Sequence, residues 1–164
     1  MEKVFSTPRL RKFKNHIEKA LDVKIYFEDD TAMIEGEGLE SYTSLSVIEA
    51  LNFGFDFNVA IQLKNEDYMI EKLNLRRYVR EGRISTVKGR IIGLKGKTKK
   101  ILSRLSDCDI ALKDNIVAII GKTSDVDICA RAVRSLIQGS PHSSVYAFLE
   151  KNRKMKKENI EDEI

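Results

Sequence analysis

The feature that most constrains the fold of this chain is an internal repeat. When Lys12 is placed over Lys97, an offset of 85 positions, the chain reads against itself without a gap for more than forty residues. The glycines of both copies then fall at expected turns. The identical pairs are Lys12/Lys97, Lys14/Lys99, Asp22/Asp107, Ile25/Ile110, Asp29/Asp114, Ile34/Ile119, Gly36/Gly121, Leu51/Leu136 and Gly54/Gly139. This pattern predicts two copies of one small α/β unit.

The second copy shows the order of elements most clearly. Residues 68–79 mix aromatic and branched residues as a strand does, and apolar residues at helical spacing follow over 84–92 and 97–105. Two strands, 108–112 and 116–120, are joined by Lys113-Asp114-Asn115, where Asp and Asn tolerate the positive φ of a tight turn. A long helix then ends at Gly139, and another begins near Pro141.

Positive charge is concentrated in the second copy. The net charge of the chain is +4, yet residues 76–104 contain eleven bases and one acid, Glu81. A segment of one sign that glycines and apolar residues interrupt is typical of a site for a polyanion. The bases are Arg76, Arg77, Arg80, Arg83, Lys88, Arg90, Lys95, Lys97, Lys99, Lys100 and Arg104.

Gly93-Leu94-Lys95-Gly96 lies between the two short helices of this basic segment. The helix after it offers unpaired N–H groups and the positive end of its dipole to an anion, and glycines let a sugar-phosphate backbone approach closely. Leu94 offers an apolar contact and Lys95 a phosphate contact. We therefore predict that this loop grips a single strand of nucleic acid, whose bases lie in an apolar groove floored by Ile91, Ile92 and the adjacent strand.

The order of elements and this loop resemble a KH domain of the eukaryotic-type topology, whose Gly-x-x-Gly loop clamps about four nucleotides. The segments Lys88-Gly89-Arg90-Ile91-Ile92-Gly93-Leu94-Lys95-Gly96-Lys97-Thr98 and Gln138-Gly139-Ser140-Pro141-His142-Ser143-Ser144-Val145-Tyr146 are similar to those of archaeal KH-domain ribosome-assembly proteins. These proteins are related to the eukaryotic small-subunit factor called partner of Nob. The resemblance covers nearly the whole chain. It implies the fold class α+β, with two tandem KH-like domains, each a three-stranded sheet packed by three helices.

The same resemblance implies a function and partners. The second domain would bind single-stranded RNA near the 3′ end of small-subunit ribosomal RNA during ribosome biogenesis. The implied protein partners are the endonuclease that trims this end and archaeal initiation factor two alpha. The residues expected to contact RNA are Lys88, Arg90, Ile91, Ile92, Gly93, Leu94, Lys95, Gly96, Lys97, Lys99 and Lys100.

The first copy departs from the pattern of an RNA-binding loop. At the offset of 85, the loop glycines fall over Pro8 and Arg11, so the equivalent loop reads Pro8-Arg9-Leu10-Arg11. Proline lacks an N–H group, and arginine restores the bulk that glycine removes. We expect residues 1–66 to form a degenerate KH-like domain that packs or holds a partner. Residues 67–164 would form the RNA-binding domain with a C-terminal helical extension.

Catalysis and cofactor binding are not expected. Gly96-Lys97-Thr98 and Gly121-Lys122-Thr123 resemble the end of a phosphate loop, but Ile91 and Ile116 stand where that loop needs its first glycine. The acids of residues 28–40 map to a strand-turn-strand hairpin, where exposed acids usually serve solubility. These acids are Glu28, Asp29, Asp30, Glu35, Glu37 and Glu40.

The histidines and cysteines give no metal-binding pattern. His16 and His142 lie in different copies without a partner at ligand spacing. Cys108 and Cys129 are too far apart for a Cys-x-x-Cys site, and both are expected in the core. We therefore predict a protein without a metal, a cofactor or an enzymatic activity.

One alternative function remains open at this point. The chain could serve as a general RNA-binding or protein-interaction scaffold, for messenger RNA or a translation-initiation factor, with no role in rRNA maturation. Phe53-Gly54-Phe55-Asp56-Phe57 is the best candidate for a docking patch, although core packing is its expected use. No apolar run is long enough to span a membrane, and residues 1–14 lack the apolar stretch of a signal peptide, so we expect a cytoplasmic protein.

Overall fold

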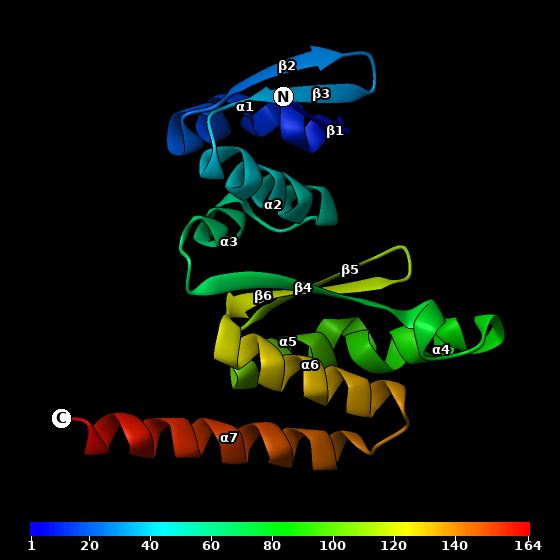
Figure 1. The fold of residues 1–164 in the computed structure, drawn as a ribbon. Coiled ribbons are helices and arrows are strands. Elements are labelled where there is room, and N and C mark those ends of the chain that lie inside the picture. Colours follow the sequence, from blue (N-terminus) through cyan, green and yellow to red (C-terminus); the bar gives the residue numbers. More distant parts are fainter. The chain divides into compact units, whose positions relative to one another are not determined.

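The computed structural model describes residues 1–164, apart from the side chains of residues 39–41. Glu40, one of the acids considered above, therefore lies outside the described side chains. The chain divides into two compact units, Met1–Ile70 and Glu71–Ile164. Its strands form two three-stranded sheets, in agreement with the predicted α+β fold (Figure 1). Among the described residues, no helix is long and apolar enough to cross a membrane.

The first unit is an antiparallel sheet with helices packed against it. Its strands take the order β1-β3-β2, so that β3 pairs with both of the others. Ala32 and Ile34 alternate along β3, and both are fully buried, as is Ile25, the partner of Ile34 on β2. The elements are β1 (Glu2–Phe5), α1 (Pro8–Leu21), β2 (Lys24–Glu28), β3 (Thr31–Glu35), α2 (Leu39–Phe53), α3 (Phe57–Ala60) and a 3-10 turn (Ile61–Lys64).

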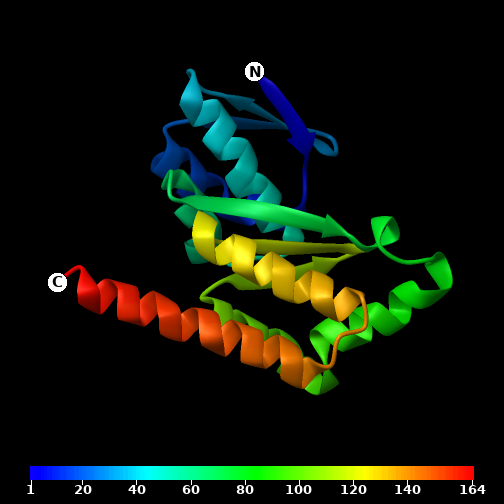
Figure 2. The same ribbon diagram turned by 60° about the horizontal axis from the view of Figure 1, so that its bottom comes forward.

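The second unit has the same strand order, β4-β6-β5. Helices α4, α5 and α6 pack on one another beneath its sheet, and α7 packs against α5 and α6 (Figures 1 and 2). The elements are β4 (Tyr68–Asn74), a 3-10 turn (Leu75–Arg77), α4 (Glu81–Ile92), a 3-10 turn (Leu94–Gly96), α5 (Lys97–Ser106), β5 (Asp109–Lys113), β6 (Ile116–Lys122), α6 (Thr123–Ile137) and α7 (His142–Asp162).

The repeat in the sequence is also seen in the structure, where several residues 85 positions apart have the same backbone conformation. β2 and β5 have bounds that differ by the offset of 85. At that same offset, Asp22 and Asp107 both end a helix with φ of 52° and 55°, and Asp29 and Asp114 both turn a hairpin with φ of 51° and 56°. Aspartate tolerates this left-handed region better than most residues, because its short polar side chain hydrogen-bonds locally. Gly54 and Gly139 follow, with φ of 100° and 101°.

The repeat fails before α1, and there one of our predictions is wrong. Residues 8–11 do not form a loop: they are the first turn of α1, and only Ser6 and Thr7 separate it from β1. The Thr7 hydroxyl accepts a hydrogen bond from Leu10 N at 3.1 Å, and Pro8 suits the first helical position because its φ is already helical. The first unit therefore lacks a counterpart of α4.

The aromatic segment after α2 contributes to packing in the first unit. Phe55 is buried, which agrees with the predicted core role. Phe57 is half-buried and stacks on Phe13 of α1, with ring centroids 5.6 Å apart.

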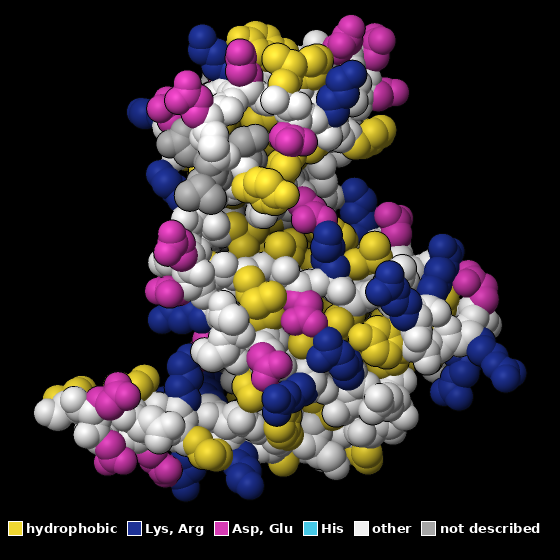
Figure 3. Space-filling view, in the orientation of Figure 1, with side chains coloured by type: hydrophobic (Ala, Val, Ile, Leu, Met, Phe, Trp, Pro, Cys, Tyr) yellow, Lys and Arg dark blue, Asp and Glu magenta, His cyan; other side chains and the backbone are white. Residues whose placement is uncertain are grey.

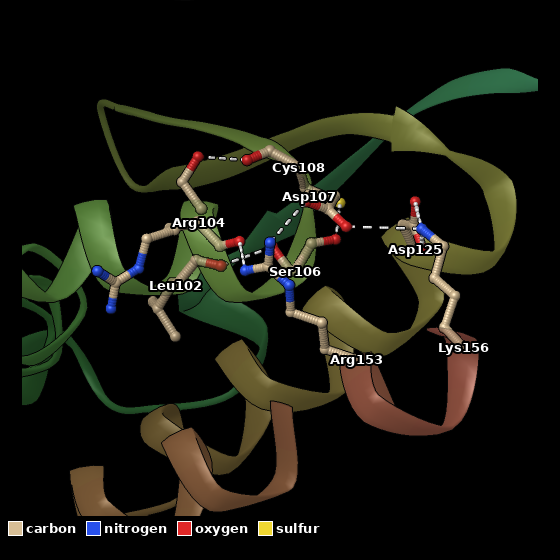
Figure 4. Close-up of polar contacts among 9 residues, drawn as sticks. Leu102, Arg104, Ser106, Asp107, Cys108, Asp125, Arg153 and Lys156 are labelled. Atoms are coloured by element: carbon tan, nitrogen blue, oxygen red, sulfur yellow. Dashed lines mark hydrogen bonds and ion pairs between the residues drawn. The ribbon is translucent and has the colours of Figure 1, made fainter. Parts of the chain in front are cut away.

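The C-terminal half of α7 is held to the second unit by charge (Figure 4). Lys156 Nζ donates to both carboxylate oxygens of Asp125, at 2.9 and 3.0 Å, and lies 3.6 Å from Asp107. Burial alone lowers the pKa of Lys156, but the hydrogen bond to Asp125 and the charges of both aspartates outweigh it and raise the pKa overall. Arg153 adds a hydrogen bond of 2.9 Å to Arg104 O. The long extension is thereby a fixed part of the second unit.

Candidate nucleic-acid interface

Helix α4 presents one face to the core and leaves the others for the site. Ile84, Val87 and Ile91, spaced by three and four residues, are buried. Ile91, which we expected in the floor of the groove, has no exposed surface and therefore packs beneath the site. Lys88 and Ile92 are half-buried on another face of the helix. Of the two isoleucines, the structure leaves Ile92 available for a contact.

Gly93 ends α4 for a steric reason. Its φ of 73° is a conformation that residues with a side chain rarely adopt. A Cβ atom at this position would lie 2.3 Å from Thr98 Oγ1 and 2.7 Å from Thr98 N. Thr98 is itself 7% exposed and cannot move away easily. The first glycine is therefore required by the close packing of the loop on α5.

The remainder of the glycine loop (residues 93–96) projects into solvent. Leu94 is 83% exposed, an unusual state for a large apolar side chain. Lys95 takes a left-handed conformation with φ of 53°, and Gly96 follows with φ of 76° and open space where a Cβ would lie. No side chain caps the N-terminus of α5, which begins directly after Gly96. The loop thus exposes an apolar tip, a lysine and a helix N-terminus together.

Positive charge surrounds this loop, as the sequence predicts. Lys and Arg side chains gather over α4 and the turn before it (Figure 3). Within the described part of the chain, Arg76 is the one base of residues 76–104 with a carboxylate partner, Glu81 at 3.4 Å. Lys95, Lys97 and Lys100 are exposed, and Lys99 is half-buried. Unpaired cations beside a helix N-terminus favour the binding of an anion.

An arginine clasp ties the end of α4 to the segment before α7. The Arg90 guanidinium donates to Ser140 O, and His142 Nε2 lies 2.9 Å from Arg90 O. The first unit has an equivalent contact, because Arg9 donates to Phe55 O at 2.7 Å and residue 55 lies 85 positions before Ser140. Arg90, expected as added charge around the loop, therefore also has a structural role that the sequence did not indicate.

Three residues of the site were missed by sequence reasoning. Thr98 supports Gly93, and His142 and Tyr146 of α7 lie beside the loop in an open pocket of about 550 Å³. The segment that contains the two aromatic residues had drawn attention by its resemblance to other proteins. Its position next to the loop depends on the path of the chain between α6 and α7.

The acidic, histidine and cysteine side chains are the candidate metal ligands of this chain. No group of three or more His, Cys, Asp or Glu side chains among the described residues could hold a metal ion. Cys108 and Cys129 are both buried in the core, as predicted. Contact with Cys129 and burial raise the pKa of the Cys108 thiol, which keeps it protonated and unreactive.

Comparison with known proteins agrees with this geometry. Residues 69–154, which include the glycine loop, match the model of the second KH domain of PNO1, a eukaryotic-type KH domain of type I. The chain belongs to the PNO1 family of KH-domain proteins. A KH domain-containing protein of Methanocaldococcus jannaschii is 31% identical over 156 residues, which cover 90% of this chain and 69% of that protein.

Eukaryotic relatives are longer than this chain. The pre-rRNA-processing protein pno1 of Schizosaccharomyces pombe is 34% identical over 119 residues, or 71% of this chain and 49% of that protein. Other relatives, such as that of Dictyostelium discoideum, carry the name RNA-binding protein pno1. The match to them covers about half of their length or less.

Solved archaeal structures share the fold. Dim2p of Pyrococcus horikoshii superposes with a TM-score of 0.80 at 30% identity, over 92% of this chain and 98% of that one. A chain in the a/eIF2alpha–aDim2p–rRNA complex of the same organism gives a TM-score of 0.83 at 30% identity, over 93% of each chain. The predicted family resemblance and the KH-like α+β fold are therefore confirmed.

Proposed function

We propose that this protein binds single-stranded RNA through the glycine loop of its second unit. The observation that carries the proposal is the exposure of Leu94 at the tip of a loop that leads into an uncapped helix N-terminus. A large apolar side chain held in solvent among unpaired lysines suits a ligand that is both anionic and apolar. Single-stranded RNA has these two properties, because its phosphates alternate with unstacked bases.

The RNA target that we favour is the 3′ end of small-subunit ribosomal RNA precursor. The support comes from relatives, which include a pre-rRNA-processing protein and a chain crystallised with rRNA. The latter complex also contains a/eIF2alpha, which makes the archaeal factor a candidate partner. The endonuclease that trims this end is a further candidate partner, from the family resemblance alone.

We assign different roles to the two halves of the chain. Residues 67–164 would be the RNA-binding KH domain, and residues 1–66 a degenerate KH-like domain, so that the chain is a tandem of two. The shared strand order and the turns repeated at 85 positions support this assignment. In the first unit, Pro8 and Arg11 lie in the first turn of α1, so this segment forms no loop that could bind a phosphate. That unit would extend the surface or hold a protein.

The decisive experiment replaces the loop tip with charge. Leu94→Asp combined with Lys95→Asp should abolish binding of a fluorescein-labelled RNA dodecamer with the sequence of the small-subunit 3′ end, measured by fluorescence anisotropy. The control is Ala147→Asp with Lys151→Asp, two exposed positions on α7 that give the same change in net charge. If the loop variant binds as the unchanged protein does, the proposal is wrong.

A second experiment separates rRNA maturation from general RNA binding. Crosslinking of the protein to cellular RNA, followed by mapping of the adducts, should place them near the small-subunit 3′ end. Adducts spread over messenger RNA would leave RNA binding in place and remove the role in ribosome assembly. A pure protein scaffold would give few adducts at moderate salt.

A further inference from the structure

The strongest unassigned feature is the open pocket on the α7 side of the glycine loop. It has a volume of about 550 Å³ and lies between the end of α4, the loop and the first turns of α5 and α7. The residues that line it include Gly89, Arg90, Leu94, Lys97, His142 and Tyr146. It therefore combines an apolar tip, two aromatic rings and basic side chains.

The aromatic wall of this pocket is held in place. His142 and Tyr146 lie one helical turn apart, with ring centroids 6.1 Å apart and planes inclined by 58°. The arginine clasp fixes the start of α7, and Val145 and Leu149 bury its inner face. Figure 2 shows the start of α7, in orange, beside the green helices α4 and α5. Both rings are half-buried, so each keeps an accessible surface.

Gly89 leaves the wall of the pocket on α4 without a side chain. It lies inside α4, where glycine destabilises a helix relative to alanine. Its φ is not in the left-handed region, and a Cβ atom would meet no atom within 4 Å. Neither the backbone nor the packing of the protein requires a glycine at this position. Because Gly89 lines the pocket, the missing side chain allows a ligand to approach α4 closely.

The pocket lies on one of the two sides of the loop along which a bound strand would continue. Lys88 and Ile92 lie on one face of α4, whereas Gly89 and Gly93 lie on the face that lines the pocket. A strand whose phosphate rests on the loop must continue on both sides of it. One side leads toward Ile92, and the other leads toward Tyr146. Its next phosphate can then reach Lys97, which lines the pocket and is exposed.

We propose that this pocket is a nucleotide subsite, in which one base of the bound RNA stacks on Tyr146 and His142 while its sugar passes over Gly89. This inference rests on the proposed RNA binding by the glycine loop and extends it by one nucleotide. Stacking on aromatic rings tolerates any base, so the subsite adds affinity without selecting a sequence.

The first test uses two glycines of α4. Gly89→Ala should leave the melting temperature unchanged or raise it, because alanine favours the helix, and should weaken binding of the RNA dodecamer about fivefold by filling the pocket. Gly82→Ala is the matched control, since Gly82 is also in α4, also meets no atom within 4 Å, and lies outside the pocket. It should bind RNA as the unchanged protein does.

The second test reads the stacking directly. Tyr146→Leu should weaken binding about tenfold, within the range for one base stacked on an aromatic ring, while Tyr146→Phe should restore it. In dodecamers with 2-aminopurine at successive positions, one position should be quenched by the unchanged protein and by Tyr146→Phe but not by Tyr146→Leu. Normal affinity and quenching in Tyr146→Leu and Gly89→Ala, with binding still lost in Leu94→Asp/Lys95→Asp, would overturn the subsite and keep the proposed function. Unchanged binding by the loop variant would overturn both.

Discussion

Residues 8–11 and 93–96 align in the sequence repeat but have different structures. In the second unit, residues 93–96 form an exposed loop between α4 and α5. In the first unit, residues 8–11 are the capped first turn of α1, directly after a strand. After these segments, the bounds of β2 and β5 and the left-handed aspartates and glycines match at the offset of 85. The turns and strand order that the two units share therefore do not depend on the loop, and its presence in the second unit alone agrees with the binding role proposed for it.

The two units also differ in the position of the arginine that forms the clasp. Both units tie the residue after the left-handed glycine, Phe55 or Ser140, to an arginine. In the first unit this arginine is Arg9, which aligns with Leu94 of the glycine loop. In the second unit it is Arg90, from a helix that the first unit lacks. Because α4 supplies the clasp, residues 93–96 are free to project into solvent.

The largest effect should come from the glycine that the fold itself requires. Gly93→Ala should reduce the free energy of unfolding of the second unit by about 2–4 kcal/mol, because it adds both a left-handed strain and a clash with Thr98. Gly96→Ala, with the strain alone, should cost about 1–2 kcal/mol. Urea denaturation of both variants measures the difference. Equal losses would show that the packing on Thr98 is not tight.

The next prediction compares the arginine clasp of Arg90 with the equivalent contact of Arg9 in the first unit. Arg90→Met should destabilise the second unit by about 1.5–3 kcal/mol, the range for a hydrogen bond from a charged group, and should weaken RNA binding because the loop and α7 lose their tie. Arg9→Met should destabilise the first unit by a similar amount. Its RNA affinity, measured below the unfolding transition, should stay unchanged. A loss of affinity in Arg9→Met would assign RNA binding to the first unit as well.

A smaller effect is expected from an attempt to restore glycines in the first unit. Pro8→Gly combined with Arg11→Gly should reduce stability by about 1–2 kcal/mol, because both positions are helical in α1. It should not create an RNA site, since no helix precedes the segment. Anisotropy with the RNA dodecamer, in the background of Leu94→Asp/Lys95→Asp, tests this. Recovered binding would mean that glycines alone define the site.

The smallest effect concerns a pair of lysines that the repeat aligns. Lys97→Ala should weaken RNA binding several-fold and lower the slope of log affinity against log salt by about 0.7, the value for one single-strand phosphate contact. Lys12→Ala, its counterpart in the first unit, should change neither quantity. Titrations at several salt concentrations give both slopes. Equal effects of the two lysines would indicate a diffuse attraction to the whole basic surface.

Much of the second unit could be predicted from local sequence. Turn chemistry and apolar spacing placed the hairpin at Asp114, the end of α6 near Gly139 and the exposed loop, because these features depend on neighbouring residues. The start of α1 was mispredicted for the opposite reason. Alignment to the second copy suggested a loop at residues 8–11, whereas Thr7 and Pro8 together favour a helix start.

By itself, the sequence determined the repeat, the basic segment and the glycine loop, since each can be read from residues close together in the chain. The tertiary structure decided what those residues touch. In the folded protein Ile91 is buried, and Gly93 packs so closely on Thr98 that no side chain fits there. Arg90 donates a hydrogen bond to Ser140 O. The tertiary structure also brought Tyr146 beside a loop some fifty positions earlier in the chain. Contacts between distant residues depend on how helices pack, and no local pattern encodes them.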